Sequence, residues 1–258
     1  MLINYWIKSA SYFKRSFFPP LTRVTIALEL FAVHIMGSID SKTMNQLKCN
    51  IDQVKRERIE SFYFQEDAIR VLFADILIRV VTCHKLNLKN KDISFLTDYY
   101  GKPYLFNRYR YHFNLAHSGN WIICAVADCA VGIDIEAIKE IDFGLAKFFL
   151  NKTEYEYFIN TAEKERKLLF YQLWVLKESY VKATGKGLYT PLNTFQVICD
   201  GKITNNLKEP DSLFLFKQYN IDNDYATALC AKNSVLELPK TIEILTIETL
   251  IEDFSALT

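Results

Sequence analysis

The sequence has no excess of charge of one sign: 31 Lys and Arg stand against 30 Asp and Glu among its 258 residues. General attraction to nucleic acid or to a membrane surface needs a strong basic excess, so any cationic site must be local. With only 8 Gly and 6 Pro, fibrous and linker-like classes are excluded. No run approaches the roughly 18 consecutive apolar residues of a membrane helix. We therefore expect no nucleic-acid partner and no membrane partner.

The 6 cysteines form no C-x-x-C pair and have no His at zinc-finger spacing. Most lie among apolar residues, as in the WIICAVA segment, which suits small buried side chains in a reducing cytoplasm. The chain is 50% hydrophobic and 14% aromatic, enough to bury a core, which excludes overall disorder. A cytoplasmic globular protein is predicted.

The order of predicted elements indicates two similar halves. In the first, a strand over 24–36 precedes helices that Asp40 and Asp52 can cap, and apolar residues at three- and four-residue steps predict a helix over 66–86. Strands over 111–128 follow. In the second, a strand over 131–136 precedes a short helix over 152–160, a long helix over 164–183 that ends at Gly185, and three strand-like segments.

This order predicts an α+β fold with an N-terminal lobe over 23–128 and a C-terminal lobe over 129–258. Residues 1–22 are aromatic and basic and end near Pro19 and Pro20. They form an extension of unknown role, with attachment to a membrane surface as the alternative.

The pentapeptide GIDIE, residues 132–136, carries two acidic residues two positions apart. On a strand, Ile133 and Ile135 face one side and Asp134 and Glu136 face the other. Two adjacent carboxylates repel each other, and a divalent cation removes that penalty. The alternative is a solvated strand edge that ends in acidic residues.

The long helix places Trp174, Glu178 and Lys182 at four-residue steps, hence on one face. Taken alone, this pattern is also that of a Glu–Lys surface pair beside a core Trp. His117 ends an apolar strand, where a hydrogen-bonded structural His is the commoner case. The remaining candidate cations, which could equally be solvated, are Lys55, Arg58, Arg70 and Lys102.

Together, the motifs resemble those of 4'-phosphopantetheinyl transferases of the surfactin-synthetase-activating (Sfp) type. The segments that carry the resemblance are, in order, KRERIESFYFQEDAIRVL, YGKPYL, FNLAHSGNW, GIDIE, FFLNKTEY and WVLKESYVKATGKGL, within about residues 24–195. The resemblance implies two lobes related by a pseudo-two-fold axis, with the active site at their interface and a monomer sufficient for activity. It implies transfer of 4'-phosphopantetheine from coenzyme A to a serine of an apo acyl or peptidyl carrier protein, a holo-[acyl-carrier-protein] synthase reaction that releases adenosine 3',5'-bisphosphate.

The resemblance also implies roles for individual residues. Asp134, Glu136 and Glu178 would bind Mg²⁺, or Mn²⁺, as hard oxygen ligands. Glu178 would accept the serine proton, and Lys182 would bind the pyrophosphate and stabilise the departing nucleotide.

Coenzyme A also carries a 3'-phosphate. By resemblance, Lys55, Arg58 and His117 would contact this phosphate, and Arg70 and Lys102 the nucleotide or pyrophosphate. Two positions depart from the family pattern: Ala116 stands where a Ser or Thr is usual, and Val71 where close relatives have Thr. These changes place a nucleotide hydrogen bond and the adenine pocket in doubt.

The segment from Ile141 to Ala162 would contact the carrier, with Phe148 and Phe149 as the side chains to examine for exposure. Two other classes fit parts of the pattern. One is a different Mg²⁺-dependent phosphoester enzyme, such as a nuclease or hydrolase. The other is a carrier-binding homologue that has lost catalysis, against which the joint presence of the acidic residues and Lys182 argues.

Overall fold

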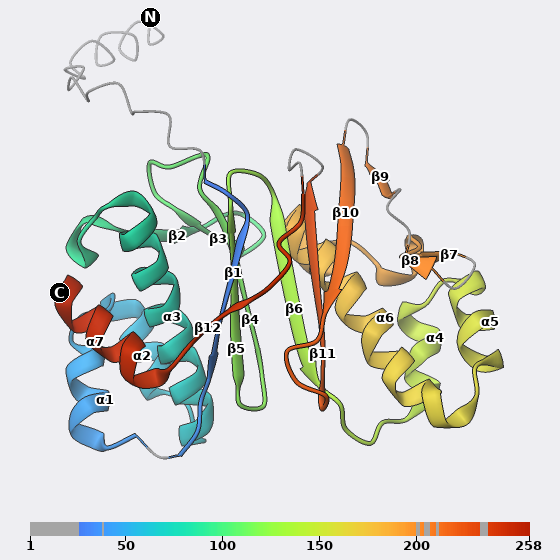
Figure 1. The fold of residues 1–258 in the computed structure, drawn as a ribbon, viewed down its shortest axis with the longest axis horizontal. Coiled ribbons are helices and arrows are strands. Elements are labelled where there is room, and N and C mark those ends of the chain that lie inside the picture. The colour runs from blue at the N-terminus through green and yellow to red at the C-terminus, as the bar shows by residue number, and fades with distance from the viewer. Residues whose placement is uncertain (1–25, 38, 200–201, 204–206, 210–211, 233–236) are drawn as a thin grey trace, which may run out of the picture.

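The computed structural model describes residues 26–37, 39–199, 202–203, 207–209, 212–232 and 237–258. Two four-stranded sheets form its centre, with strand orders β12-β1-β5-β4 and β6-β11-β10-β9 (Figure 1). All neighbours are antiparallel except β12, which runs parallel to β1. The strands of the first sheet are β1 (Glu29–His34), β4 (His112–Ser118), β5 (Trp121–Ala127) and β12 (Glu243–Leu245), and those of the second are β6 (Val131–Ala137), β9 (Leu207–Glu209), β10 (Ser212–Tyr219) and β11 (Tyr225–Lys232). Two small hairpins pair β2 (Phe95–Thr97) with β3 (Pro103–Leu105) and β7 (Ile198–Cys199) with β8 (Lys202–Ile203).

The two sheets pack face to face because their strands are apolar on both sides. In β1, Leu30 and Ala32 belong to the core between the sheets, whereas Phe31 and Val33 belong to the core on the outer side. This alternation is the period of two expected of a strand. The inner layer includes Ile123, Ala125, Ile133, Ile135, Leu229 and Ala231. The predicted α+β class is confirmed.

Two long helices of 22 residues each cover the outer faces of the sheets (Figure 1). Helix α3 (Gln65–Leu86) shares the first sheet's outer core, and α6 (Glu163–Thr184) that of the second. The sequence predicted both. Helix α6 ends at Gly185, whose φ of 75° is in the left-handed region that favours glycine, as predicted.

The shorter helices are α1 (Ser41–Lys48), α2 (Gln53–Glu60), α4 (Ala146–Phe149), α5 (Lys152–Asn160) and α7 (Ile247–Leu257). Asp40 caps α1, since its carboxylate accepts hydrogen bonds from the N–H groups of Lys42 and Thr43 at 3.0 Å. The cap expected from Asp52 is wrong. Asp52 precedes α2 but makes no capping bond, because its carboxylate accepts instead from the buried guanidinium of Arg79.

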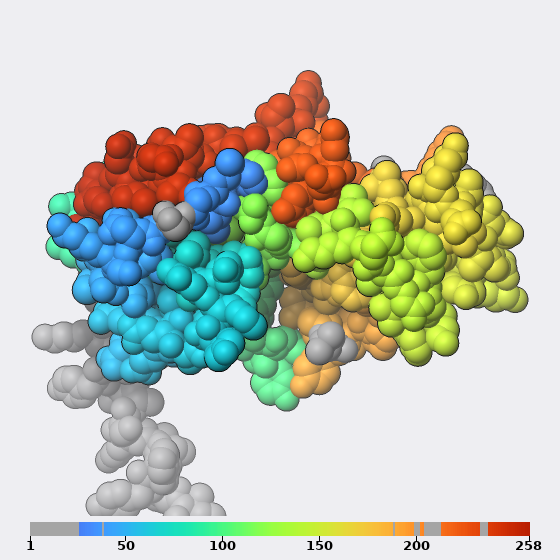
Figure 2. All heavy atoms as spheres, turned by 90° about the horizontal axis from the view of Figure 1, so that it is seen from below, coloured from blue at the N-terminus to red at the C-terminus, as the bar shows by residue number. Residues whose placement is uncertain are grey.

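The end of the chain returns to the first sheet. Strand β12 pairs with β1, and α7 buries Leu250 and Phe254 in the same core as α3. Figures 1 and 2 show α7 in red beside the blue N-terminal helices. The last strand and helix of the expected C-terminal lobe therefore pack with the first sheet, because their apolar side chains complete the core that α3 covers.

Of the helices within the described residues, none is long and apolar enough to cross a membrane. The expected extension 1–22 lies outside those residues.

Candidate active site

The site forms where β6 packs against α6, and Gly132 makes that contact possible. A Cβ added to Gly132 would lie 2.0 Å from the carbonyl oxygen of Ser179 and 2.3 Å from the amide nitrogen of Ala183. The strand and helix backbones thus approach more closely than any side chain at this position allows. Residues two and four positions after Gly132 share its face, so Asp134 and Glu136 are directed towards α6.

Asp134 is the buried centre of the site. Its Oδ1 accepts a hydrogen bond from the Lys182 Nζ at 2.6 Å, whereas its Oδ2 is buried without a hydrogen-bond partner. The pKa of Asp134 is raised to about 7, mainly by burial, which Lys182 opposes and the nearby Glu136 and Glu178 reinforce. The predicted acidic face of GIDIE is therefore directed into the protein, and the solvated-edge alternative does not describe it.

Glu136 and Glu178 complete the acidic group from two different elements. Glu136 Oε2 accepts a hydrogen bond from the Ser118 hydroxyl at 2.8 Å, and that hydroxyl also accepts from the Ala137 N–H at 3.0 Å. Ser118 ends β4, so this bond connects the first sheet to the acidic strand of the second. Burial is the main cause that raises the pKa of Glu178, and Glu136 adds to it, while Lys182 lowers it. No motif in the sequence singled out Ser118, although it directly follows His117.

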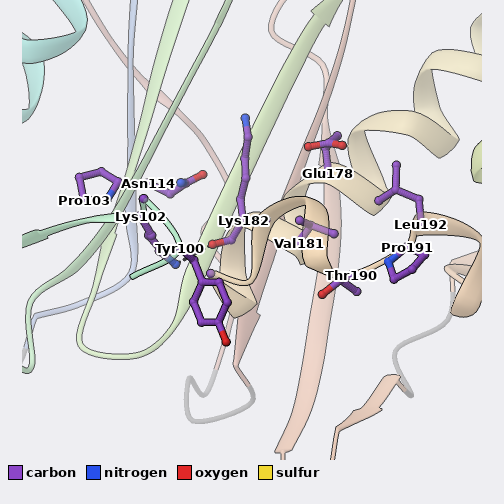
Figure 3. Close-up of a pocket in the computed structure, with 13 residues that line it drawn as sticks. Tyr100, Lys102, Pro103, Asn114, Glu178, Val181, Lys182, Thr190, Pro191 and Leu192 are labelled. Carbon is purple, nitrogen blue, oxygen red and sulfur yellow. Dashed lines mark hydrogen bonds between the residues drawn. The ribbon is translucent and has the colours of Figure 1, made fainter. Parts of the chain in front are cut away.

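Glu178 and Lys182 line a pocket of about 380 Å³ between the two halves of the chain (Figure 3). Asn114 of β4 also lines it, and its side-chain oxygen accepts from the Ile133 N–H at 2.8 Å, which joins the two sheets. The rest of the lining is mostly apolar or backbone, from Tyr100, Gly101, Lys102, Pro103, Val181, Gly185, Gly187, Thr190, Pro191 and Leu192.

The acidic residues suit a hard divalent cation by their chemistry. Carboxylate oxygens are the ligands that Mg²⁺ prefers, and the unpartnered Oδ2 of Asp134 is a buried acceptor in need of a positive partner. In the part of the chain that the structure describes, however, no three His, Cys, Asp or Glu side chains converge as a ready-made metal cage. The ammonium of Lys182 takes one of the Asp134 oxygens instead.

The predicted cation Lys102 lies beside the pocket, but its ammonium is engaged by the backbone. Its Nζ donates to the carbonyl oxygens of Lys182 at 2.6 Å, Ala183 at 3.1 Å and Val131 at 3.2 Å. It therefore binds the C-terminal end of α6, where carbonyls lack helical partners. Burial lowers the pKa of Lys102 to about 8.

His117 and Arg70 lie close enough to influence each other electrostatically. The His117 side chain is exposed, but its neighbours shield it from part of the solvent, which lowers its pKa, and the positive charges of Arg70 and Lys182 lower it further. Arg70 donates to the Gly119 carbonyl at 3.2 Å and pairs with Asp67 at 2.5 Å. The structure thus brings His117 and Arg70 to the side of the site on which Lys182 lies.

The other two predicted cations are on α2. Lys55 pairs with the buried Asp75 at 3.5 Å, and Asp75 is in turn bound by Arg79 at 2.6 Å. Arg58 is exposed. Among the residues that the structure describes, no hydrogen bond or ion pair joins either residue to His117 or Lys182.

Directly beside Glu178, Lys177 forms a fully buried ion pair that sequence analysis did not single out. Its Nζ lies 2.7 Å from Glu154 Oε2 and donates to the carbonyls of Leu192 and Phe195 at 2.8 and 2.7 Å. Glu154 also accepts from the Val197 N–H at 2.6 Å. This network fixes α5 and the segment after α6 against the helix that carries Glu178.

Of the two phenylalanines singled out in the expected carrier-binding segment, one is exposed and one is part of the core. Phe148 is 67% exposed, whereas Phe149 is buried and packs against Trp174 and Phe170.

Two family profiles match adjoining parts of the chain: "4'-phosphopantetheinyl transferase, N-terminal" over residues 40–129 and "4'-phosphopantetheinyl transferase superfamily" over 130–230. The chain belongs to the 4'-phosphopantetheinyl transferase family, as its motifs indicated. It is therefore an enzyme that transfers 4'-phosphopantetheine from coenzyme A to a carrier protein.

Curated relatives of the Sfp type cover most of the chain. It is 35% identical to 4'-phosphopantetheinyl transferase Sfp of Bacillus subtilis over 226 residues, which are 87% of this chain and 100% of the relative. It is 36% identical to 4'-phosphopantetheinyl transferase gsp of Aneurinibacillus migulanus over 74% of this chain and 83% of that protein. A more distant relative, the L-aminoadipate-semialdehyde dehydrogenase-phosphopantetheinyl transferase of Rattus norvegicus, is 33% identical over 54% of this chain and 50% of its own.

Proposed function

We propose that the acceptor is a serine hydroxyl of an apo acyl or peptidyl carrier protein, that the reaction depends on Mg²⁺ or Mn²⁺, and that it releases adenosine 3',5'-bisphosphate. This is the reaction of a holo-[acyl-carrier-protein] synthase. The observation that carries the proposal is the meeting of Asp134 and Glu136 from β6 with Glu178 and Lys182 from α6 on one face. The pocket lined by Glu178 and Lys182 gives a ligand access to this face.

Asp134, Glu136 and Glu178 would hold the cation, with the buried Oδ2 of Asp134 as one acceptor. A divalent cation bound there would neutralise the charge of the pyrophosphate and polarise it. The protein's own contribution is to keep the acidic residues together. Gly132 allows the helix and strand to meet, and the Ser118 hydroxyl holds Glu136 at 2.8 Å.

Glu178 would accept the proton of the attacking serine hydroxyl. Burial and the charge of Glu136 raise its pKa, which makes it a stronger base than a solvated carboxylate. Lys182, one helical turn further on, supplies the positive charge that binds the pyrophosphate and stabilises the departing nucleotide. The attacking and leaving oxygens must lie in line, so catalysis depends mainly on positioning and charge stabilisation.

Phosphates of coenzyme A would be bound by His117 and Arg70, because the charges of Arg70 and Lys182 both act on His117. Lys55 and Arg58 of α2 would meet the 3'-phosphate at the edge of this site. For Lys102 we propose an indirect part: because its ammonium donates to three carbonyls, it holds the end of α6 beside the pocket.

The exposed Phe148 and its neighbours in 141–162 form our proposed carrier-binding surface. We further propose that the protein is a cytoplasmic monomer of two pseudo-symmetric lobes, 23–128 and 129–258, with 1–22 as an extension. Support for the lobes comes from two four-stranded sheets, each covered by a 22-residue helix. This division has one exception: β12 and α7 lie in the second lobe by sequence but pack with the first sheet.

The test is to incubate the enzyme with coenzyme A, Mg²⁺ and a panel of apo-carriers, and to quantify adenosine 3',5'-bisphosphate by chromatography. We expect one nucleotide per modified carrier, none with a carrier whose serine is replaced by alanine, and none after chelation of the metal. Hydrolysis of coenzyme A without carrier modification would instead identify a phosphoester hydrolase. Release of the nucleotide at full rate in excess chelator would refute the part assigned to the cation.

A further inference from the structure

Lys182 is the ammonium that pairs with the buried acid of the site. Its Nζ lies 2.6 Å from Asp134 Oδ1, and its side chain is 28% exposed while that of Asp134 is 5% exposed. The same lysine lines the pocket that Glu178 also lines (Figure 3). Lys182 therefore has two possible partners: the acid on one side and an anion in the pocket on the other.

We propose that Lys182 and the divalent cation are alternative partners of the Asp134 carboxylate, so that Lys182 leaves Asp134 when the cation binds and its ammonium becomes available to the pyrophosphate. This proposal rests on the proposed function, because it concerns the cation assigned there. It goes further in making one lysine the internal counter-ion of the acidic group before it becomes a ligand of the substrate.

The Lys182 ammonium and a divalent cation bound to the same Asp134 carboxylate would repel each other. Two like charges within hydrogen-bond distance of one carboxylate repel each other strongly, most of all where little water screens them. Asp134 cannot move away to relieve this repulsion. It is fixed in β6 between Ile133 and Ile135, which are buried between the two sheets.

Lys182, by contrast, can move. It has a long, flexible side chain in the last turn of α6, and the pocket beside it gives it room. The helix itself stays in place, because the Lys102 ammonium binds the Lys182 carbonyl at 2.6 Å and Gly132 packs against the Ser179 carbonyl. A change of partner therefore needs only a change of side-chain rotamers.

The first experiment measures the reactivity of the Lys182 amine towards acetic anhydride, read by peptide mass spectrometry, with Mg²⁺ as the only added ligand. We expect saturating Mg²⁺ to raise acetylation of Lys182 several-fold. Lys164, on the same helix with an 83% exposed side chain, is the internal control and should not respond. In Asp134→Asn, Lys182 should be reactive from the start and insensitive to Mg²⁺.

The second experiment measures Mg²⁺ affinity by titration calorimetry. Lys182→Met should bind Mg²⁺ at least about tenfold more tightly than the unmodified chain, because a competing charge is removed. The matched variant Lys164→Met should bind as the unmodified chain does. Thermal unfolding of each variant checks that the fold is kept.

The possible failures are distinguishable. If calorimetry detects Mg²⁺ binding but Lys182 acetylation does not change, the exchange is refuted and the proposed transferase chemistry stands. If neither Mg²⁺ nor Mn²⁺ binds, both the exchange and the cation's part in the reaction are refuted. If the exchange is observed but no carrier is modified, the exchange stands and the proposed acceptor does not.

Discussion

Gly132 and Ser179 are in backbone contact: a Cβ at Gly132 would lie 2.0 Å from the Ser179 carbonyl oxygen. Ser179 directly follows Glu178, and Asp134 is two residues after Gly132. This one contact between strand and helix therefore sets the distance between the two acids of β6 and Glu178 of α6. The first residue of GIDIE is as much a part of the site as the acidic residues that follow it.

Gly132→Ala tests this contact. The added methyl group would force α6 away from β6, and we expect the variant to lose about 3 kcal/mol of stability, the upper end of typical overpacking. Transferase activity should fall further than the loss of folded protein explains. The control is Gly144→Ala, where the nearest atom to the new Cβ is a side-chain oxygen of the exposed Asp142 at 3.0 Å. Equal denaturation midpoints in urea for the two variants would contradict the account.

The buried pair of Lys177 and Glu154 should be essential for stability. Lys177→Met leaves Glu154 charged and buried, which typically destabilises a fold by about 3–5 kcal/mol. Lys152→Met removes the exposed partner of Glu156 on the same helix as Glu154, and should change stability by no more than about 0.5 kcal/mol. Urea unfolding measures both. A Lys177→Met protein as stable as Lys152→Met would show that the pair does not hold α5 to α6.

Binding of adenosine 3',5'-bisphosphate should depend on pH through His117. The pKa of His117 is lowered in the free protein, so the imidazole is neutral at pH 8, and a bound phosphate favours the protonated form. Binding therefore takes up a proton and becomes tighter as pH falls from 8 to about 6.5, by at most about tenfold per pH unit. Below that range the phosphate itself gains a proton.

Calorimetry without metal checks this dependence. His117→Gln should bind more weakly at pH 6.5 and lose the dependence, whereas His84→Gln, which alters an exposed histidine of α3, should keep it. An identical pH profile for His117→Gln and the unmodified chain would remove His117 from the phosphate site.

Replacement of Lys102 separates a structural from a ligand-binding role. Lys102→Met removes the donor shared by the carbonyls of Val131, Lys182 and Ala183, and we expect a loss of about 1–3 kcal/mol of stability. Affinity for adenosine 3',5'-bisphosphate should be kept in the folded fraction. Full stability with weakened nucleotide binding would show instead that Lys102 contacts the ligand directly.

Features that depend on local periodicity could be predicted from the sequence. Helix α3 and the shared face of Asp134 and Glu136 follow from spacing of 3.6 or 2 residues, and the end of α6 follows from Gly185, which favours the left-handed backbone found there. The meeting of β6 with α6 came from the family resemblance, because no local pattern places Glu178 beside a strand about 40 residues earlier.

What the sequence could not predict depends on contacts between distant segments. Lys102 reaches carbonyls some 80 residues away, and Glu154 and Lys177 pair across two helices. From the sequence alone, each of these side chains would be predicted to be a charged residue exposed to solvent. The return of β12 to β1 likewise depends on which core has room for α7, which composition does not reveal.

We expect Glu178, together with the acids of β6, to carry the transfer. The intact mass of an apo-carrier tests this after incubation with coenzyme A, Mg²⁺ and either the unmodified enzyme or Glu178→Gln. The carrier should gain one phosphopantetheine group with the unmodified enzyme, and the rate should fall by at least about 100-fold with a Glu178→Gln protein that unfolds at a similar temperature. A Glu178→Gln protein that modifies the carrier at the unmodified rate would rule out this role of Glu178.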